Sequence, residues 1–222
     1  MSNIVLVIAA HSDDEALGCA GTMAKHIAAG DKVHVLFMTD GVSSRNSGSS
    51  EASKRLSSAE KAAEIFGVDS MHNLNFPDNK MDTVPLLDVI QAIEKKVAEI
   101  LPGIIYTQHI GDLNIDHQIT HKAVMTACRP QPQFCVKEIY AFEVLSSTEW
   151  QPPSAHPFIP NVFVDISNHI EAKRKVLEIY SDEMREPPHS RSIENAINLS
   201  IFRGNTVGSA YAEAFICLRF IK

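Results

Sequence analysis

The sequence predicts a single α/β domain, in which helices cover both faces of a mostly parallel sheet. Two observations lead to this class. Short apolar runs rich in β-branched residues recur along the chain, which is typical of strands buried on both faces. Segments with helical character alternate with these runs, as they do in βαβ folds. The 222 residues contain no internal repeat and no clear linker, so one domain over residues 1–222 accounts for the chain.

The clearest elements come first. Residues 4–10 form a continuous apolar run and predict a buried strand. Residues 15–29 read as a helix that ends at Gly30, and residues 33–39 predict a second buried strand. A strand, a helix and a strand in this order imply parallel pairing through a crossover. The serine-rich stretch 42–53 is predicted to be a loop from its composition.

The remaining elements continue the alternation. Further helices are predicted at 54–66, 84–100, 116–127, 168–183 and 192–202. Further strands are predicted at 71–76, 104–107, 137–144, 162–166 and 215–221. Apolar residues recur at helical spacing from Leu87 to Val97, which makes that helix the most clearly amphipathic. The stretch 146–161 carries four prolines and predicts a long surface loop.

Composition and charge exclude several classes. The chain is 45% hydrophobic and 21% charged, which is ordinary globular composition. The net charge is −7 and no basic block occurs, so we expect no nucleic-acid partner. No run approaches the roughly 20 apolar residues of a membrane span, so we expect no membrane partner. Four scattered cysteines without a CxxC pair favour the cytoplasm, and a homo-oligomer is compatible with the sequence.

Polar residues gather after the predicted strands. In open α/β sheets, sites lie beyond the carboxyl ends of the strands, where strand order reverses. Loops 11–18, 40–55 and 108–121 each follow a predicted strand and are rich in functional groups. We therefore expect the site among these three loops.

Directly after the first strand, one histidine and three acids stand together: His11, Asp13, Asp14 and Glu15. A helix N-terminus accounts for acidic residues through the macrodipole, but not for the histidine. A dinucleotide site is a second interpretation, because Gly18 is followed 22 positions later by Asp40. However, the G-x-G-x-x-G pattern is absent, and three acids would repel a pyrophosphate. A metal is the third interpretation, with His11 and Asp14 as two zinc ligands.

The loop after the strand at 104–107 could supply a third ligand. Residues 109–121 contain three histidines and two aspartates in 13 positions. His117 and His121 are spaced i,i+4 and would share one helix face, so either could bind the ion. A metal site shared between the two loops accounts for both clusters.

The sequence also resembles a known family. His11-Ser-Asp-Asp-Glu15 resembles the H-P-D-D-E signature of the PIG-L/LmbE-like zinc N-deacetylases, and Asp112-Leu-Asn-Ile-Asp-His117 resembles their D-x-H-x-D-H motif. Further similar segments extend almost to the C-terminus: Thr39-Asp-Gly41, Arg55 with 62–67, 188–192, Arg203-Gly204 and 212–215.

The resemblance implies a Rossmann-like fold and hydrolysis of an N-acetyl group on an amino-sugar derivative related to N-acetylglucosamine. Carried over by position, the ligands of one zinc ion per chain are His11, Asp14 and His117, and the general base is Asp13. From their own context rather than from the family pattern, Arg55, Asp40 and His189 are assigned to substrate binding, although Arg55 also fits a solvated helix start. Asp116 and Asp112 are assigned to orienting neighbouring histidines. His189 and Arg191 lie beside two prolines and would either close the pocket or only terminate a helix.

Three positions depart from the family pattern. Ser12 replaces a proline, Ser58 replaces a glutamate, and Asn114 replaces the first histidine of the second motif. Asparagine donates a hydrogen bond but cannot carry a proton. We therefore expect Asn114 to assist the oxyanion and Asp13 to shuttle the proton, helped by His109 or His189. Asn114 also leaves open a catalytically altered sugar- or metal-binding protein; a nucleotide-binding oxidoreductase is disfavoured by the missing glycine pattern.

Overall fold

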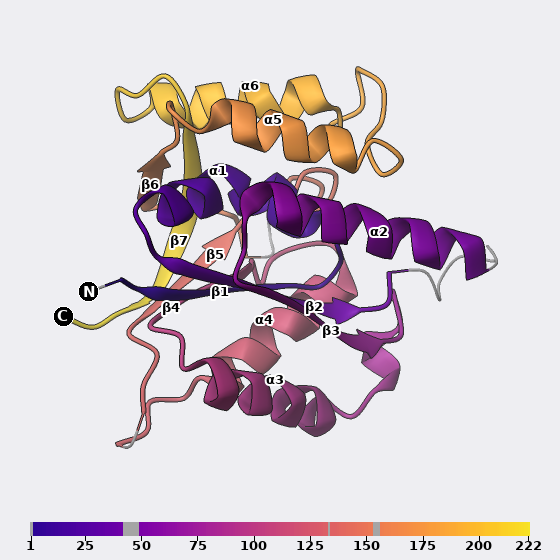
Figure 1. The fold of residues 1–222 in the computed structure, drawn as a ribbon, viewed down its shortest axis with the longest axis vertical. Helices are drawn as coiled ribbons and strands as arrows, with labels where there is room; N and C mark the ends of the chain where they lie inside the picture. Colours follow the sequence, from indigo (N-terminus) through magenta and orange to yellow (C-terminus); the bar gives the residue numbers. More distant parts are fainter. Residues whose placement is uncertain (1, 42–48, 133, 153–155) are drawn as a thin grey trace.

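The computed structural model describes residues 2–41, 49–132, 134–152 and 156–222. Its centre is a seven-stranded sheet of order β3-β2-β1-β4-β5-β7-β6, with helices on both faces, as the sequence predicts (Figure 1). The strands are β1 (Ile4–Ala9), β2 (Lys32–Thr39), β3 (Ser70–Phe76), β4 (Ile104–Gln108), β5 (Glu138–Phe142), β6 (Val162–Asp165) and β7 (Ala212–Phe220). The helices are α1 (Asp14–Ala28), α2 (Ser49–Phe66), α3 (Leu86–Ile100), α4 (Ile115–Ala127), α5 (Ile170–Ile179) and α6 (Ile193–Asn205), with a short 3-10 helix at Met81–Thr83.

Strands β1 to β5 are parallel, and β7 runs antiparallel to both β5 and β6. In the central register, Val7 of β1 lies opposite Val35 of β2 on one side and Tyr106 of β4 on the other. The chain builds outward from β1 in one direction to β3 and in the other from β4, so the strand order reverses between β1 and β4. The loops that follow these two strands diverge there and leave room for a site.

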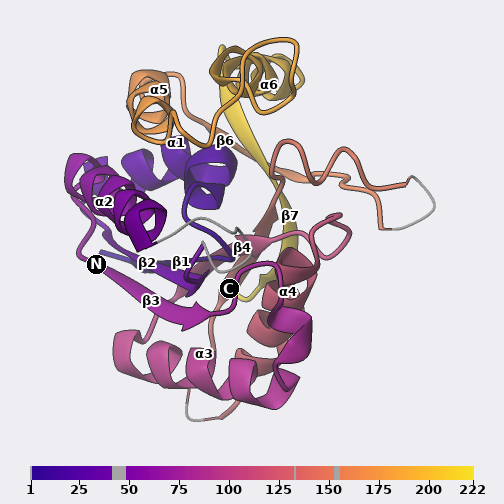
Figure 2. The same ribbon diagram turned by 90° about the vertical axis from the view of Figure 1, so that its right-hand side faces the viewer.

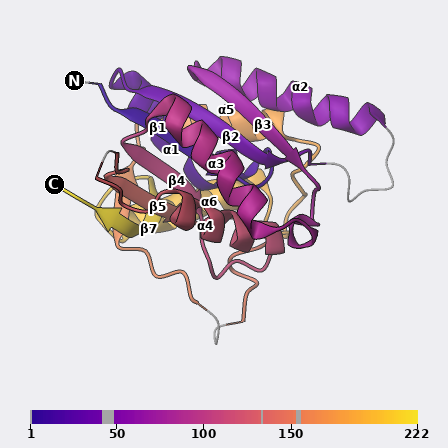
Figure 3. The ribbon, with the colours of Figure 1, turned by 90° about the horizontal axis from the view of Figure 1, so that it is seen from below.

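The sheet lies between two helical layers. Helices α1, α2, α5 and α6 cover one face, and α3 and α4 cover the other (Figures 2 and 3). Along β1, Val5 and Val7 pack into the first layer, whereas Leu6 and Ile8 pack into the second. Burial on both sides explains why this strand is continuously apolar. None of the helices in the described ranges combines the length and apolar character needed to span a bilayer.

Helix α2 corrects one boundary. The loop predicted over 42–53 is wrong for residues 49–53, which are helical; residues 42–48 lie outside the described residues. Glu51, Ala52 and Lys54 are good helix formers, so the serine content of this stretch is a poor guide. The other boundaries differ by a few residues.

Helix α1 contains a bend that the sequence does not reveal. Cys19 has non-helical dihedral angles (φ −148°, ψ 20°), so the first turn has its own direction. The N–H groups of Gly21 and Thr22 donate to the buried carboxylate of Glu213 on β7, at 3.0 and 2.7 Å. Lys173 of α5 pairs with the same carboxylate at 2.7 Å. This buried ion pair fixes the bend, and with it the orientation of the first turn of α1.

Candidate functional site

A small polar cavity of about 150 Å³ opens where strand order reverses. Its lining comes from the segments that follow β1, β3, β4 and β5, together with α2 and the stretch between α5 and α6. The lining residues are His11, Asp13, Arg55, Asp78, Asn79, Asn114, His117, Ser146, Ser147, Glu183 and Arg191. The cavity therefore lies at the sheet edge at which the sequence predicts a site.

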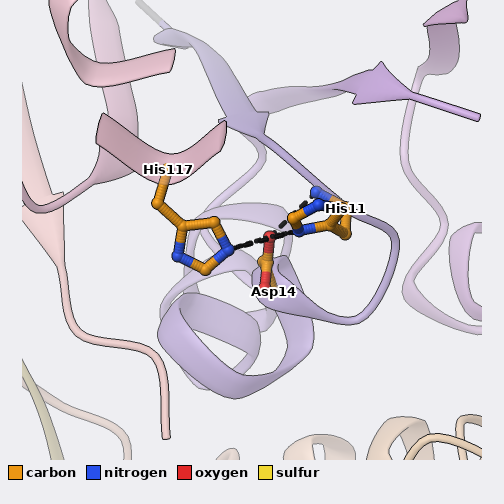
Figure 4. Close-up of side chains that lie close together, drawn as sticks. All are labelled: His11, Asp14 and His117. Atoms are coloured by element: carbon orange, nitrogen blue, oxygen red, sulfur yellow. Dashed lines mark hydrogen bonds and ion pairs between the residues drawn. The ribbon is translucent and has the colours of Figure 1, made fainter. Parts of the chain in front are cut away.

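Three side chains converge beside this cavity (Figure 4). Asp14 Oδ2 lies 3.3 Å from His11 Nδ1 and 3.3 Å from His117 Nε2, and the two ring nitrogens are 3.2 Å apart. A tetrahedral zinc ion with bonds of about 2.0–2.1 Å holds its ligands roughly 3.3–3.4 Å from one another. The observed triangle of donor atoms matches that spacing. All three residues are buried, so they could hold a metal ion together.

The outer nitrogens of both imidazoles face carboxylates. His11 Nε2 lies 3.1 Å from Asp78 Oδ1 and 3.2 Å from Asp116 Oδ2, and His117 Nδ1 lies 3.1 Å from Asp112 Oδ2. Because carboxylates accept hydrogen bonds, the ring protons belong on these outer nitrogens. Asp14 Oδ2 accepts from the backbone N–H of His11 at 2.8 Å and from Gln108 Nε2 at 2.9 Å, which fixes it beside the inner nitrogens. Two imidazole nitrogens and one carboxylate oxygen at this spacing form a donor set that fits a metal ion.

A second grouping of His11, Asp78 and Asp116 is also close enough to share an ion. It would use the outer nitrogen of the same imidazole, where the two carboxylates already accept the ring proton. Backbone N–H groups of Asn79 and Met81 donate to Asp116 at 2.6 and 3.1 Å and fix it further. We therefore assign these two aspartates to the orientation of His11.

The buried acids make the cluster attractive to positive charge. Burial lowers the pKa of His117, but Asp14 and Asp112 raise it more, to about 9. Burial likewise lowers the pKa of His11, and hydrogen bonds to Asp116, Asp14 and Asp78 raise it well above its ordinary value. Burial raises the pKa of Asp14, yet the two histidines hold it well below the usual range.

Asp13 has an unusual backbone conformation. Its φ of 116° and ψ of −26° lie in the left-handed region, which costs a non-glycine residue about 1–3 kcal/mol. Glu15 stabilises this turn, because its Oε2 accepts from Asp13 N at 2.9 Å and its Oε1 accepts from the Tyr180 hydroxyl at 2.7 Å. As a result, the Asp13 side chain lines the cavity while that of its neighbour Asp14 faces the histidines.

Two arginines flank the Asp13 carboxylate. Arg191 Nη1 donates to Oδ2 at 2.7 Å, and Arg55 Nη2 lies 3.6 Å from Oδ1. Arg55 Nε also lies 3.6 Å from Glu183 Oε1. Burial raises the pKa of Asp13 by more than these guanidinium groups lower it. Arg55 lines the cavity, and its role in substrate binding stays a prediction.

Asp112 is fixed by the turn that follows β5. Thr148 Oγ1 donates to its Oδ2 at 2.7 Å, Ser147 Oγ donates to its Oδ1, and the Asn114 N–H donates to the same Oδ1 at 2.9 Å. Burial raises the pKa of Asp112, but His117 and these hydroxyls lower it further. The turn thereby sets the orientation of Asp112, whose Oδ2 lies 3.1 Å from His117 Nδ1.

Asn114 has both a structural and a cavity-facing position. Its Oδ1 accepts from the Asp116 N–H at 2.8 Å, so it is the N-cap of α4. Its Nδ2 donates to Asn79 Oδ1 at 3.0 Å, and the side chain lines the cavity. A primary amide carries two N–H donors, so one remains for a ligand.

The structure does not bring every predicted residue to the cavity lining. His109 Nε2 donates to the His156 carbonyl at 2.7 Å, and burial lowers the pKa of this histidine. His189 Nδ1 accepts from the Arg191 N–H at 3.0 Å, and Asp40 follows β2 outside the lining. His121 Nδ1 donates to the carbonyl of Gln108 at 2.8 Å, so the geometry favours His117 as the third ligand.

Six lining residues are missing from the predicted set: Asp78, Asn79, Ser146, Ser147, Glu183 and Arg191. Asp78 and Asn79 follow β3, so the expectation that sites lie beyond the carboxyl ends of strands also covers their position. Glu183 and Arg191 come from the stretch between α5 and α6. The family resemblance includes residues 188–192 and so covers Arg191, but no local pattern indicates that Glu183 reaches the cavity.

Known proteins resemble this chain over most of its length. The family model "PIG-L: GlcNAc-PI de-N-acetylase" matches residues 6–128, more than half of the chain. The uncharacterized deacetylase YaiS of Escherichia coli (strain K12) is 30% identical over 167 residues, which cover 73% of this chain and 81% of YaiS. The diacetylchitobiose deacetylase of Thermococcus kodakarensis is 27% identical over 98% of this chain and 82% of its own length.

A solved structure, that of the conserved protein TT1542 from Thermus thermophilus, superposes with a TM-score of 0.76 at 26% identity. The match covers 100% of this chain and 97% of that protein. The family model covers the strand-end loops that hold His11, Asp14 and His117. The chain therefore belongs to the PIG-L family of de-N-acetylases.

Proposed function

We propose that the chain is a zinc-dependent hydrolase that removes the N-acetyl group from an amino-sugar derivative. The observation that carries this proposal is the convergence of His11 Nδ1, Asp14 Oδ2 and His117 Nε2 at the edge of a cavity that also contains the Asp13 carboxylate. Two nitrogen donors and one carboxylate form a three-ligand set typical of catalytic zinc. The deacetylases among the relatives support the same reaction.

The cavity suits a substrate with many hydroxyl groups. Its lining consists of charged, amide, hydroxyl and imidazole side chains, each of which pairs with sugar hydroxyls. A relative named diacetylchitobiose deacetylase supports an N-acetylated sugar as the substrate class. Arg55 and Arg191 are placed to contact substrate oxygens; the roles of Asp40 and His189 in substrate binding remain predictions.

When bound, a zinc ion supplies a nucleophilic water at neutral pH and polarises the acyl carbonyl. Asp13 accepts the proton of the attacking water and passes it to the leaving nitrogen, so one carboxylate serves as base and then as acid. Arg191 holds that carboxylate in the cavity through its 2.7 Å hydrogen bond. Asn114 donates its free amide N–H to the developing oxyanion. We assign both proton transfers to Asp13, since His109 and His189 do not line the cavity; a helper role for either histidine remains a prediction.

The decisive experiment separates metal binding from chemistry. Metal analysis of the purified protein should find about one zinc ion per chain, and His117→Ala should lose it. Asp13→Asn should keep the metal and the fold but release acetate from N,N′-diacetylchitobiose about 10²–10⁴-fold more slowly. His121→Gln is the matched control and should keep the metal. Full zinc retention in His117→Ala would contradict the ligand set.

If the zinc-loaded wild-type protein releases no acetate from N-acetylated sugars, a sugar- or metal-binding protein becomes the better assignment. Two further proposals concern the setting of the protein. We propose the cytoplasm as its location, which is compatible with its four free cysteines, Cys19, Cys128, Cys135 and Cys217. A homo-oligomer remains a prediction.

A further inference from the structure

The cavity is smaller than pockets that enclose a whole ligand. Its volume is about 150 Å³. Pockets that enclose a drug-sized ligand measure about 300–1,000 Å³. A substrate with more than one sugar ring therefore extends past the mouth of the cavity. This step rests on the proposed function.

One large, exposed aromatic side chain follows two cavity-lining residues closely in the chain. Ser146 and Ser147 line the cavity, and Trp150, the only tryptophan of the chain, follows within the same turn. Its indole is 52% exposed and lies edge-on to the His189 ring, with ring centroids 5.6 Å apart. His189 Nδ1 accepts from the N–H of Arg191, whose guanidinium reaches the Asp13 carboxylate. The indole is thus connected to the Asp13 carboxylate through His189 and Arg191.

The turn that carries Trp150 is held by several hydrogen bonds. The Glu149 carboxylate accepts from the N–H groups of Ser146 and Ser147, at 2.7 and 3.2 Å. The Thr148 N–H donates to the Val144 carbonyl at 2.9 Å, and Arg191 Nε donates to Ser146 Oγ at 2.8 Å. A fixed aromatic ring loses little conformational freedom when a ligand binds, so it can serve as a binding surface.

We propose that Trp150 is the stacking surface for a second pyranose ring, linked to the ring that carries the acetamido group. The C–H face of a pyranose is apolar and packs on the π face of an indole, while its hydroxyls stay in water. Leu113, which is 50% exposed, donates its backbone N–H to the Ser147 carbonyl at 3.4 Å and adds apolar surface beside this turn. The preferred substrate is accordingly an oligosaccharide of at least two rings.

The first test uses the tryptophan itself as the probe. In zinc-loaded Asp13→Asn protein, N,N′-diacetylchitobiose should change the tryptophan emission in a saturable way and bind about five- to tenfold more tightly than N-acetylglucosamine. Because Trp150 is the only tryptophan, any change reports on this surface. Calorimetry on the same protein measures occupancy independently. Calorimetric binding of the disaccharide without a change in emission, or no binding of the disaccharide at all, would overturn the proposal.

The second test is kinetic. In Trp150→Ala, the ratio of kcat/KM for the disaccharide to kcat/KM for the monosaccharide should fall about five- to tenfold, with zinc content unchanged, and Trp150→Phe should restore most of it. Phe220→Ala removes an aromatic side chain of similar exposure, 53%, from the opposite end of the sheet and should leave the ratio unchanged.

An unchanged ratio in Trp150→Ala would overturn the assignment. A stronger preference for an aryl glycoside of N-acetylglucosamine than for the disaccharide would overturn the choice of a sugar as occupant. Failure of the wild-type protein to release acetate from either sugar would contradict the proposed function instead, and the emission titration would still decide whether the second ring binds at Trp150.

Discussion

At the scale of single residues, Asn114 combines two tasks that mutation can separate. Its carbonyl oxygen caps α4, and its amide nitrogen faces the cavity. Serine also caps helices well but has no amide, whereas alanine does neither. Asn114→Ser therefore isolates the chemical contribution of the amide from its contribution to stability.

We expect Asn114→Ala to lower the free energy of unfolding by about 1 kcal/mol and the melting temperature by about 2–4 °C. Its turnover should fall by about tenfold to a few hundredfold with the metal retained, because one donor to the oxyanion is lost. Asn114→Ser should keep the wild-type melting temperature but show the same loss of turnover. Calorimetry and acetate release measure the two effects; full activity in Asn114→Ser would exclude a chemical role for the amide.

The candidate site was predictable where local sequence and strand position coincide. His11 and Asp14 follow a buried strand within a few residues, and His117 follows the neighbouring strand in the sheet, so one rule locates all three. Arg191 was harder to predict because it approaches Asp13 from a position 178 residues away in the chain. No local sequence pattern near Arg191 indicates its contact with Asp13. That contact depends on how the stretch between α5 and α6 packs over the sheet edge.

At the scale of elements, the turn after β5 supports the metal site without contributing a ligand. Thr148→Val removes the hydroxyl that donates to Asp112 Oδ2 while keeping the shape of the side chain. Zinc affinity should fall about 10–100-fold, since Asp112 would hold His117 less firmly. Competition with a chromophoric chelator measures the affinity, and Thr148→Ser should restore most of it. Thr206→Val removes an exposed hydroxyl and serves as the control. A similar loss of zinc affinity in Thr206→Val would show that the effect is not specific to Thr148.

Helix α4 gives a pH dependence that is separate from the metal ligands. Burial lowers the pKa of His121, so its neutral form is favoured in the folded protein. The unfolded chain, with a histidine pKa of about 6.5, then binds more protons as the pH falls. The stability contributed by neutral His121 is complete above about pH 7 and is lost progressively as the pH drops through about 6.5 toward the lower folded value. Urea unfolding between about pH 5 and 8 should show a smaller decline for His121→Gln than for the wild type; equal declines would contradict this assignment.

The elements themselves were largely predictable, because strand burial and helix periodicity are local signals. β1 and β2 appear in the sequence as continuous apolar runs, and α3 appears through its helical spacing. The predicted start of α2 is wrong, because serine content is a weak indicator of a loop beside good helix formers such as Glu51, Ala52 and Lys54. The bend at Cys19 was also invisible, since Glu213 and Lys173 fix it from distant positions in the chain.

At the scale of the whole molecule, the proposed ion joins parts of the chain that are 106 residues apart, at His11 and His117. An ion that binds only the folded state adds its binding free energy to the stability of the fold, about 4 kcal/mol when its concentration is about 1,000 times its dissociation constant. A chelator should therefore lower the melting temperature by about 8–16 °C. His117→Ala should show no response to the chelator. Identical melting of zinc-loaded and chelated wild-type protein would argue against a resident ion.

The parallel core from β1 to β5 follows from the alternation of strands and helices in the sequence, but the placement of the C-terminal strand does not. β7 inserts between β5 and β6 and runs antiparallel to both. Nothing in its own residues selects that position over the sheet edge. The position of β7 depends on the surfaces that the earlier strands and helices leave uncovered. Those surfaces are a property of the assembled molecule.

The left-handed backbone conformation of Asp13 lowers the stability of the fold, whereas the side chain at the same position is the proposed catalytic base. Glycine adopts positive φ freely, so Asp13→Gly would release backbone strain of about 1–3 kcal/mol while it removes the proposed base. A library selected for heat resistance alone would then tolerate glycine there, and we expect such variants to be inactive. Selection for turnover would favour the aspartate that we propose as the base. An engineer who seeks a hardier enzyme should accordingly leave residue 13 fixed and diversify the rest of the chain.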